Sequence, residues 1–291
     1  MDKITNEELL LLIKQAAAGD KSALETVLLS VQDLVFNLSL RMLGTFPDAE
    51  DASQEILLKI ITHLSSFKGE SSFSTWVFRI ALNHLKDYKK HMFAKFPLSF
   101  EFYGDDILHG KIDDVPDLTQ DVEKSILAEE LKLSCTNVML QCLDAESRCI
   151  FILGTMFRVD SRIAGDILGI TPDAYRQKLS RIRKKMAEFL SDYCGEYGCG
   201  KCHCSDRINY AIQNHRISPD RLDFTDAKPI SLQTSLPVSS QTAAGVKAAM
   251  EAIDDLSEEF SFCKTFQSPE ALKTFIKNFL DSTALSVIRN A

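Results

Sequence analysis

The stretch Phe67-Lys-Gly-Glu-Ser-Ser-Phe-Ser-Thr-Trp-Val-Phe-Arg-Ile-Ala-Leu-Asn-His-Leu-Lys-Asp-Tyr-Lys-Lys90 joins a short polar turn to an amphipathic segment. The turn carries Lys68, Gly69 and Glu70, and the apolar positions that can anchor the helix after it are Phe73, Trp76, Phe78, Ile80, Ala81 and Leu85. Basic and amide side chains remain on the outside, where they can meet phosphates and base edges. The pattern therefore predicts either a nucleic-acid-binding helix or an ordinary helix with a solvated basic face.

The order of residues in this stretch resembles the promoter-melting part of bacterial sigma factors, specifically the compact extracytoplasmic-function group of the sigma-70 family. The matching positions are Phe67, Lys68, Gly69, Phe73, Trp76, Arg79, Ile80, Ala81, Asn83, Asp87, Lys89 and Lys90. The resemblance implies that the turn captures an unpaired base of melted DNA. The residues expected to contact DNA here are Lys68, Arg79, Asn83, Lys86, Lys89 and Lys90, whereas Phe73 and Trp76 are expected to form the scaffold.

The composition is that of a soluble globular protein, with 45% hydrophobic and 25% charged residues. A chain of 291 residues has room for two or three small domains. No apolar run approaches the roughly 20 residues that span a bilayer, and the N-terminus lacks the pattern of a signal peptide. We therefore expect no membrane insertion and a cytoplasmic location, where thiols stay reduced.

Charge is segregated along the chain, although the net charge is −8. Residues 67–92 carry five Lys or Arg against two Asp or Glu, and residues 161–190 carry seven against three. Residues 99–130, between them, carry two basic against ten acidic residues. Two basic blocks that flank an acidic one predict two separate contacts with nucleic acid.

Residues 48–64 are expected to form an amphipathic helix with Asp48, Asp51 and Glu55 near its N-terminus. Taken alone, these carboxylates only cap and solvate a helix. Beside the 67–90 stretch, the segment resembles the part of the family that binds the clamp coiled coil of core RNA polymerase. The resemblance implies a polymerase-binding role for Asp48, Asp51, Gln54 and Glu55.

Residues 161–186 read as a helix-turn-helix. The first helix covers 161–168 and ends at Gly169, Thr171 is a fitting N-cap, and Pro172 suits the first position of the second helix. The motif resembles the family's second domain, which reads the upstream promoter element in the major groove. The residues expected to read DNA are Tyr175, Arg176, Lys178, Ser180 and Arg181. Family members usually have Glu where this chain has Arg162, so the DNA sequence that is read stays open.

Four cysteines, Cys194, Cys199, Cys202 and Cys204, fall within eleven residues among several glycines. Four thiolates close together can bind zinc, and glycine lets the backbone turn tightly enough for this. The spacing is unlike that of paired zinc knuckles. A structural zinc, another metal, a redox-active thiol cluster and plain reduced cysteines all remain open, and no cofactor is required by the rest of the sequence.

The sequence thus predicts a mostly α fold with two small helical domains, an acidic linker and a Cys-containing helical C-terminal extension. The expected boundaries are a region 2 bundle over 1–92, a mostly irregular acidic linker over 93–122 and a region 4 helix-turn-helix over 123–192. A Cys cluster and helix over 193–224, a linker over 225–245 and helices over 246–291 follow. The extension is either a built-in regulatory region or a stabilising appendage.

The function expected from these features is that of a sigma factor, which binds core RNA polymerase and promoter DNA and has no catalytic constellation of its own. An anti-sigma factor is a further candidate partner. The first alternative is a stand-alone helix-turn-helix regulator that needs no polymerase. The second is a metal hydrolase at the Cys cluster, for which His203 is the one candidate base within that cluster.

Overall fold

The computed structural model describes residues 5–92, 98–110, 117–197, 200–230 and 264–282, except for the side chains of residues 88–92. The described residues are mostly helical, which confirms the predicted fold class. Contacts divide the chain into an N-terminal unit (residues 1–88, 231–236 and 266–291) and a central unit (residues 89–230 and 237–265). The first boundary falls close to the end of the first domain expected from the sequence.

The N-terminal unit is a helical bundle built around one long helix. Its elements are α1 (Asn6–Ala17), α2 (Lys21–Leu43), α3 (Phe46–His63), the 3₁₀ turn η1 (Leu64–Ser66), α4 (Phe73–Met92) and α12 (Glu270–Asp281). Helix α2 packs against α1, α3 and α12. It ends at Gly44, whose φ of 97° requires glycine, so that α3 can begin after the N-cap Thr45.

Helix α2 has the length and hydropathy of a membrane-spanning helix, contrary to the expectation that no apolar run approaches this length. Within the described residues it is the one helix that meets both criteria, and 72% of its most apolar window is buried inside the protein. Neighbouring helices surround it. Its apolar composition is therefore explained by its place in the core of the N-terminal unit.

The central unit is also helical. Its helical elements are α5 (Phe100–His109), α6 (Lys124–Gln141), α7 (Ala145–Phe151), the π turn η2 (Ile152–Met156), α8 (Ser161–Leu168), α9 (Pro172–Tyr193), the 3₁₀ turn η3 (Cys204–Arg207) and α10 (Ile208–Gln213). The strands are β1 (Pro229–Ile230) and β2 (Thr265–Phe266). Helix α9 contacts α5, α7 and α8, and α6 contacts η3 and α10.

The expected irregular linker over 93–122 is wrong in its middle, because residues 100–109 form α5. Ser99 caps the helix by accepting a hydrogen bond from the amide of Phe102 at 3.1 Å. Phe100 and Tyr103 are buried, and their ring centroids lie 5.1 and 5.7 Å from that of Phe189 on α9. Aromatic burial outweighs the repulsion between aspartates on which the expectation rested. Residues 93–97 and 111–116 lie outside the described part.

The C-terminal extension is shared between the two units. The helix expected over 205–218 appears as η3 and α10, which pack on α6 of the central unit. Helix α12 instead belongs to the N-terminal unit. Residues 231–263, which include most of the expected linker and the first part of the expected terminal helices, lie outside the described part.

Candidate polymerase and nucleic-acid interface

Asp51 and Glu55 lie one turn apart on α3, and both are exposed. Gln54 is half-buried. Asp48 is engaged locally: the hydroxyl of Thr45 donates to Asp48 Oδ2 at 2.5 Å, and the amide of Asp48 donates to Thr45 Oγ1 at 3.3 Å. Of the four residues assigned to polymerase binding, Asp51 and Glu55 therefore present exposed carboxylates, while Asp48 is engaged with the N-cap residue Thr45.

Glu55 also connects α3 to α4. His84 Nε2 on α4 lies 3.1 Å from Glu55 Oε2, and the His84 side chain is only 12% exposed. Burial lowers the pKa of His84 below its ordinary value of 6.5, and Lys59 adds to this, whereas Glu55 and Asp87 oppose it. In the folded protein His84 therefore favours the neutral form more than it does in the unfolded chain.

The stability of the N-terminal unit is expected to fall as the pH drops below about 6.5, because the unfolded chain then takes up a proton on His84 that the folded chain resists. This contribution is fully present above pH 6.5 and is lost as the pH passes through the lower folded pKa. His84→Gln should remove this pH-dependent contribution to the stability.

Trp76 is the one tryptophan of the chain and lies in this unit, so its fluorescence during urea unfolding at pH 7.5 and pH 5.5 measures the effect. His63→Gln, at an exposed histidine of the same unit, is the control. An unchanged pH dependence in His84→Gln would contradict the assignment.

The turn before α4 exposes its polar residues and packs its aromatic ones. Lys68, Gly69 and Glu70 are exposed, and Gly69 has a φ of 75° with nothing near the position of a Cβ atom. Glycine is thus required at position 69 by the backbone conformation, since a side chain there would meet no neighbouring atoms. The turn has the exposed polar edge that the sequence predicts.

Three aromatic rings fix the turn against α4. The ring centroid of Phe67 lies 5.4 Å from that of Phe73 and 5.6 Å from that of Trp76, and Phe73 and Trp76 are stacked at 5.5 Å. Phe73 is 4% exposed, and Trp76 is half-buried. Rings that pack on one another in this way support a scaffold role more than a role in stacking with bases.

Helix α4 places Arg79, Asn83 and Lys86 on one face, at positions i, i+4 and i+7. Asn83 is exposed, and Arg79 and Lys86 are half-buried. The side chains of Lys89 and Lys90, the other two expected DNA contacts on this helix, lie outside the described part. The described residues are therefore brought together in the arrangement that the sequence predicts.

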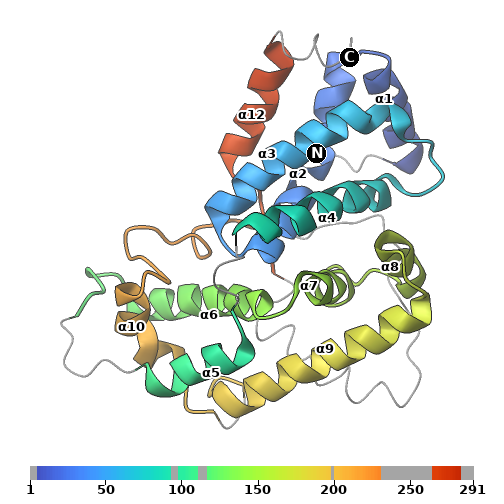
Figure 1. Cartoon of the computed structure of the whole chain (residues 1–291). Helices are drawn as coiled ribbons and strands as arrows, with labels where there is room; N and C mark the ends of the chain where they lie inside the picture. Colours follow the sequence, from blue (N-terminus) through green and yellow to red (C-terminus); the bar gives the residue numbers. More distant parts are fainter. Residues whose placement is uncertain (1–4, 93–97, 111–116, 198–199, 231–263, 283–291) are drawn as a thin grey trace. The chain divides into compact units, whose positions relative to one another are not determined.

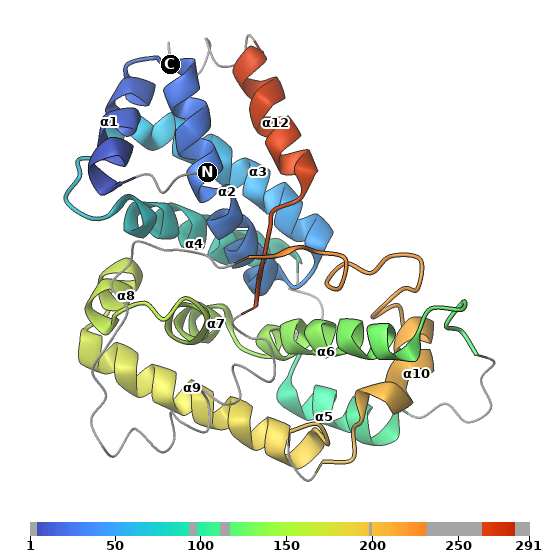
Figure 2. The same ribbon diagram turned by 180° about the vertical axis from the view of Figure 1, so that it is seen from behind.

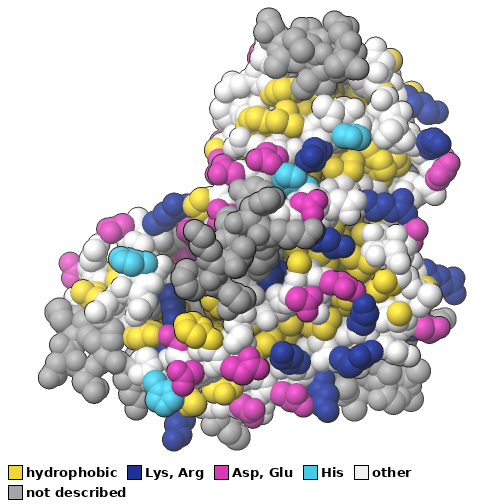
Figure 3. All heavy atoms as spheres, in the orientation of Figure 1, with side chains coloured by type: hydrophobic (Ala, Val, Ile, Leu, Met, Phe, Trp, Pro, Cys, Tyr) yellow, Lys and Arg dark blue, Asp and Glu magenta, His cyan; other side chains and the backbone are white. Residues whose placement is uncertain are grey.

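The helix-turn-helix is confirmed as α8 and α9. Gly169 adopts a φ of 70°, and Thr171 accepts a hydrogen bond from the amide of Ala174 at 3.2 Å. Gly165 allows the close approach of the turn, because a Cβ atom there would lie 2.6 Å from the carbonyl oxygen of Ile170. Figure 3 shows Lys and Arg side chains over the stretch of α9 near α8.

The residues expected to read DNA differ in their availability. Ser180 and Arg181 are exposed. The exposed guanidinium of Arg176 pairs with Asp173 and donates to Ser161 Oγ at 2.8 Å, and Lys178 Nζ lies 2.5 Å from Glu146 Oε1. These ion pairs are near the surface and can exchange for phosphate. Lys184 is also exposed on α9, at i+3 from Arg181, and extends the basic surface beyond the residues assigned from the sequence.

Tyr175 does not belong to this surface, which corrects its assignment to DNA reading. Its side chain is 1% exposed, and its hydroxyl donates to the carbonyl oxygen of Ile150 at 3.3 Å. Burial raises its pKa above the ordinary value of 10. Because the helical period places position 175 on the face that packs against α7, Tyr175 acts as a core residue.

The cysteine segment folds back on the end of α9. Cys194 and Cys202 form an isolated backbone bridge, in which the amide of Gly195 donates to the carbonyl oxygen of Cys202 at 2.9 Å. Burial raises the thiol pKa of Cys194, Cys202 and Cys204, and so favours their neutral forms. Among the described residues, no three His, Cys, Asp or Glu side chains form a group that could hold a metal ion. Cys199 lies outside these residues, so the four-cysteine zinc site stays a prediction.

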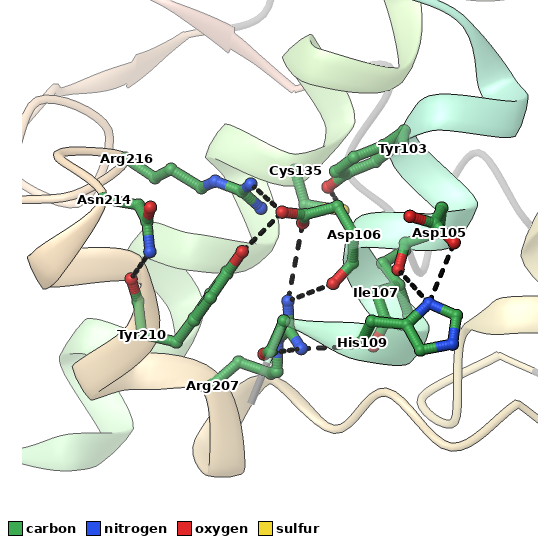
Figure 4. A network of polar contacts seen from close by, with 11 residues as sticks. Tyr103, Asp105, Asp106, Ile107, His109, Cys135, Arg207, Tyr210, Asn214 and Arg216 are labelled. Atoms are coloured by element: carbon green, nitrogen blue, oxygen red, sulfur yellow. Dashed lines mark hydrogen bonds and ion pairs between the residues drawn. The ribbon is translucent and has the colours of Figure 1, made fainter. Parts of the chain in front are cut away.

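A partly buried ionic network, which sequence reasoning missed, ties α5 to the residues after the cysteines (Figure 4). Asp106 Oδ1 lies 2.8 Å from Arg216 Nη2 and accepts a hydrogen bond from the hydroxyl of Tyr210 at 2.5 Å. Arg207 pairs with Asp106 Oδ2 at 3.5 Å and donates to the carbonyl oxygens of Ile107 at 3.1 Å and Gly110 at 2.5 Å. Arg207 and Arg216 of the C-terminal extension therefore neutralise the charge of Asp106, and Arg207 also binds carbonyl oxygens at the end of α5.

Comparisons with known proteins show which family the chain resembles. Residues 28–91 match the family described as Sigma-70 region 2, a range that includes α3, the 67–72 turn and most of α4. The chain is 27% identical over 180 residues to the "ECF RNA polymerase sigma factor SigW" of Bacillus subtilis (strain 168), covering 62% of this chain and 95% of that protein. It is 27% identical over 183 residues to the "RNA polymerase sigma factor CnrH" of Cupriavidus metallidurans, covering 62% and 93%.

A shorter stretch is more similar to a third relative. Over 77 residues, 26% of this chain, it is 36% identical to the "ECF RNA polymerase sigma-E factor" of Haemophilus influenzae and covers 40% of that protein. The match to Sigma-70 region 2 and the similarity to these relatives support a member of the sigma-70 family of RNA polymerase sigma factors, in its extracytoplasmic-function group.

Proposed function

We propose that the exposed acidic face of α3, with Asp51 and Glu55, binds a basic surface of core RNA polymerase. The observation that carries this assignment is the position of the two carboxylates in the N-terminal unit, which also holds the 67–72 turn and the basic face of α4. Polymerase supplies the chemistry of transcription. This chain supplies the contacts that direct polymerase to a promoter, and it acts in the cytoplasm with the enzyme.

The two units divide the promoter between them. The 67–72 turn holds an unpaired base of the melted strand, and Arg79, Asn83 and Lys86 contact the adjoining duplex, together with Lys89 and Lys90. Helix α9 reads the upstream element in the major groove through Arg176, Lys178, Ser180 and Arg181. Lys178 and Arg176 first exchange their surface carboxylate partners for DNA, which costs little because exposed ion pairs contribute about 0–1 kcal/mol.

Run-off transcription with purified core polymerase tests this function. The chain should direct specific initiation at promoters upstream of genes in its own genome, and core polymerase alone should not. The stand-alone regulator predicts the opposite pattern, in which the isolated chain binds promoters tightly without polymerase. No stimulation at any promoter, together with tight binding by the chain alone, would favour that alternative.

Asp51→Lys is expected to weaken binding to core polymerase at least tenfold, which corresponds to about 1.4 kcal/mol, because it places a cation against a basic surface. Affinity measured by competition with a labelled wild-type chain gives the value. Glu7→Lys makes the same charge change at an exposed residue of α1 and should bind like the wild type. Equal affinities for both variants would remove α3 from the interface.

Two further assignments remain proposals. A structural zinc bound by Cys194, Cys199, Cys202 and Cys204 is supported by the number of cysteines and by the tight backbone at Gly200, where a Cβ atom would lie 2.0 Å from the carbonyl carbon of Tyr193. Metal analysis of the purified chain tests it. An anti-sigma factor that covers the N-terminal unit is the second, and co-purification from the native organism tests that partner.

A further inference from the structure

Helix α2 carries a polar stripe inside an apolar core. Asp33, Asn37 and Arg41 are spaced at i, i+4 and i+8, so that they share one face of the helix. Asn37 and Arg41 are fully buried, and Asp33 is half-buried. Buried amides and charges are costly unless they are paired, so this stripe needs a partner.

The partner is a segment more than 220 positions away in the sequence. Asn37 Nδ2 donates to the carbonyl oxygen of Phe266 at 2.7 Å, and the amide of Phe266 donates to Asn37 Oδ1 at 2.8 Å. The amide of Ser268 donates to Asp33 Oδ1 at 2.8 Å, and the guanidinium of Arg41 lies 6.0 Å from the ring centroid of Phe266. The stripe therefore recognises the backbone of an extended segment, much as a neighbouring strand would.

Helix α12 continues this contact. Leu272, Ile276 and Leu280, at i, i+4 and i+8, are its buried residues, whereas Thr274, Lys277 and Asn278 are exposed. The helix lies beside α2 and α3 in both views of the ribbon (Figures 1 and 2). The ring of Phe266 also reaches the start of α3, 6.2 Å from the ring centroid of Phe46.

We infer that residues 265–281, the tail segment, are an internal ligand of the α2–α3 surface and that the docked tail weakens binding to core RNA polymerase. The inference rests on the proposed function, because α3 is the helix that carries Asp51 and Glu55. Helix α12 packs on α3, and Phe266 reaches the start of that helix, while Asp51 and Glu55 stay exposed. The docked tail would therefore act by occupying α3 surface beside the carboxylates and so restricting the approach of a second helical partner.

The free energies that favour and oppose docking of the tail are close enough for a competing partner to displace it. An apolar stripe of three side chains on α12 and the buried ring of Phe266 favour docking, while the conformational entropy of ordering residues 265–281 opposes it. The recognition of backbone groups by Asp33 and Asn37 adds specificity without a large apolar area. A partner that gains more contact area on the N-terminal unit can therefore displace the tail.

Ile276→Asp in the full chain tests the inference, because it puts a charge on the buried face of α12. Asn278→Asp makes a charged substitution on the exposed face of the same helix and is the control. Hydrogen exchange at the amides of Phe266 and Ser268 reports docking: both should be protected in the wild type and the control, and should exchange faster in Ile276→Asp. Circular dichroism checks that the rest of the chain is folded. If Ile276→Asp is not folded, Leu272→Asp serves as a second release variant.

Binding to core polymerase gives the decisive result. We expect at least fivefold tighter binding by the released variant than by the wild type and the control, and a synthetic peptide of residues 264–282 should reverse this gain. Equal or weaker binding by the released variant would overturn the inference and leave the proposed function intact. Failure of the wild type and all variants to bind polymerase would overturn both.

Discussion

Asp106→Ala is expected to destabilise the central unit by about 3–5 kcal/mol, the cost of removing one partner from a buried ion pair. Asp106 is 13% exposed, and its carboxylate faces Arg207, Arg216 and Tyr210, two of which carry positive charge. The variant would leave Arg207 and Arg216 half-buried without their anion. The contact between α5 and the residues after the cysteines should open first.

Asp105→Ala is a matched control at the adjacent position. The Asp105 side chain is 72% exposed, and its ion pair is with His109 of the same helix at 2.8 Å, so we expect a change below about 1 kcal/mol. Both variants remove one carboxylate, so the difference between their free energies of unfolding reports the effect of the environment of Asp106 rather than that of the charge alone.

Two probes report on the two units independently in this experiment. The fluorescence of Trp76 follows the N-terminal unit, and its unfolding transition should be unchanged in both variants. Hydrogen exchange of amides in α5 and α10 follows the central unit and should accelerate only in Asp106→Ala. Equal exchange in Asp105→Ala and Asp106→Ala would show that the network does not hold α5 in place.

Arg148→Met should destabilise the helix-turn-helix region of the central unit by about 3 kcal/mol or more, because each hydrogen bond from a charged group contributes roughly 1.5–3 kcal/mol. The buried guanidinium donates to the carbonyl oxygens of Leu140 and Leu143 at 2.6 Å each and of Gln141 at 3.1 Å. These carbonyls close the end of α6, and α7 packs on α9.

The chemistry of the site explains why a lysine would not substitute. Burial lowers the pKa of Arg148 to about 10, so the side chain stays charged at neutral pH. A lysine presents one ammonium and cannot reach three carbonyls in the fork geometry of a guanidinium. Arg148→Lys should therefore retain only a minor part of the stability.

Arg162→Met, at an exposed position of α8, is the control for Arg148→Met and should be nearly neutral. The measurement is hydrogen exchange of amides in α7 and α9, again with Trp76 fluorescence as the internal reference for the other unit. Normal exchange in α7 and α9 of Arg148→Met would show that water replaces the guanidinium at little cost.

The exposed acidic face of α3 and the basic faces of α4 and α9 were largely predictable, because they depend on short-range patterns. The spacing of apolar residues indicated α3, α4, α8 and α9, and the turn residues Gly169 and Thr171 act as expected. Exposure of a single side chain was less predictable. Tyr175 stands between basic neighbours in the sequence, yet the period of α9 turns it into the core.

Helix α5 in the acidic linker was also hidden from the local sequence pattern. Ten acidic residues between positions 99 and 130 indicate an irregular segment when only neighbours in the sequence are considered. Arg207 and Arg216, about 100 positions later, neutralise Asp106, and Phe189 covers the aromatic face of α5. A local pattern contains no information on which distant cations will be close.

The amino-acid sequence by itself therefore determined the helices, their caps, the family resemblance and the two basic surfaces, because each depends on residues within a few turns of one another. The tertiary structure alone decided which buried polar groups meet: Asp106 with Arg207 and Arg216, and Asn37 with Phe266. Such pairs join residues that are far apart in the chain, and they form only when the packing of apolar helix faces brings their backbones together.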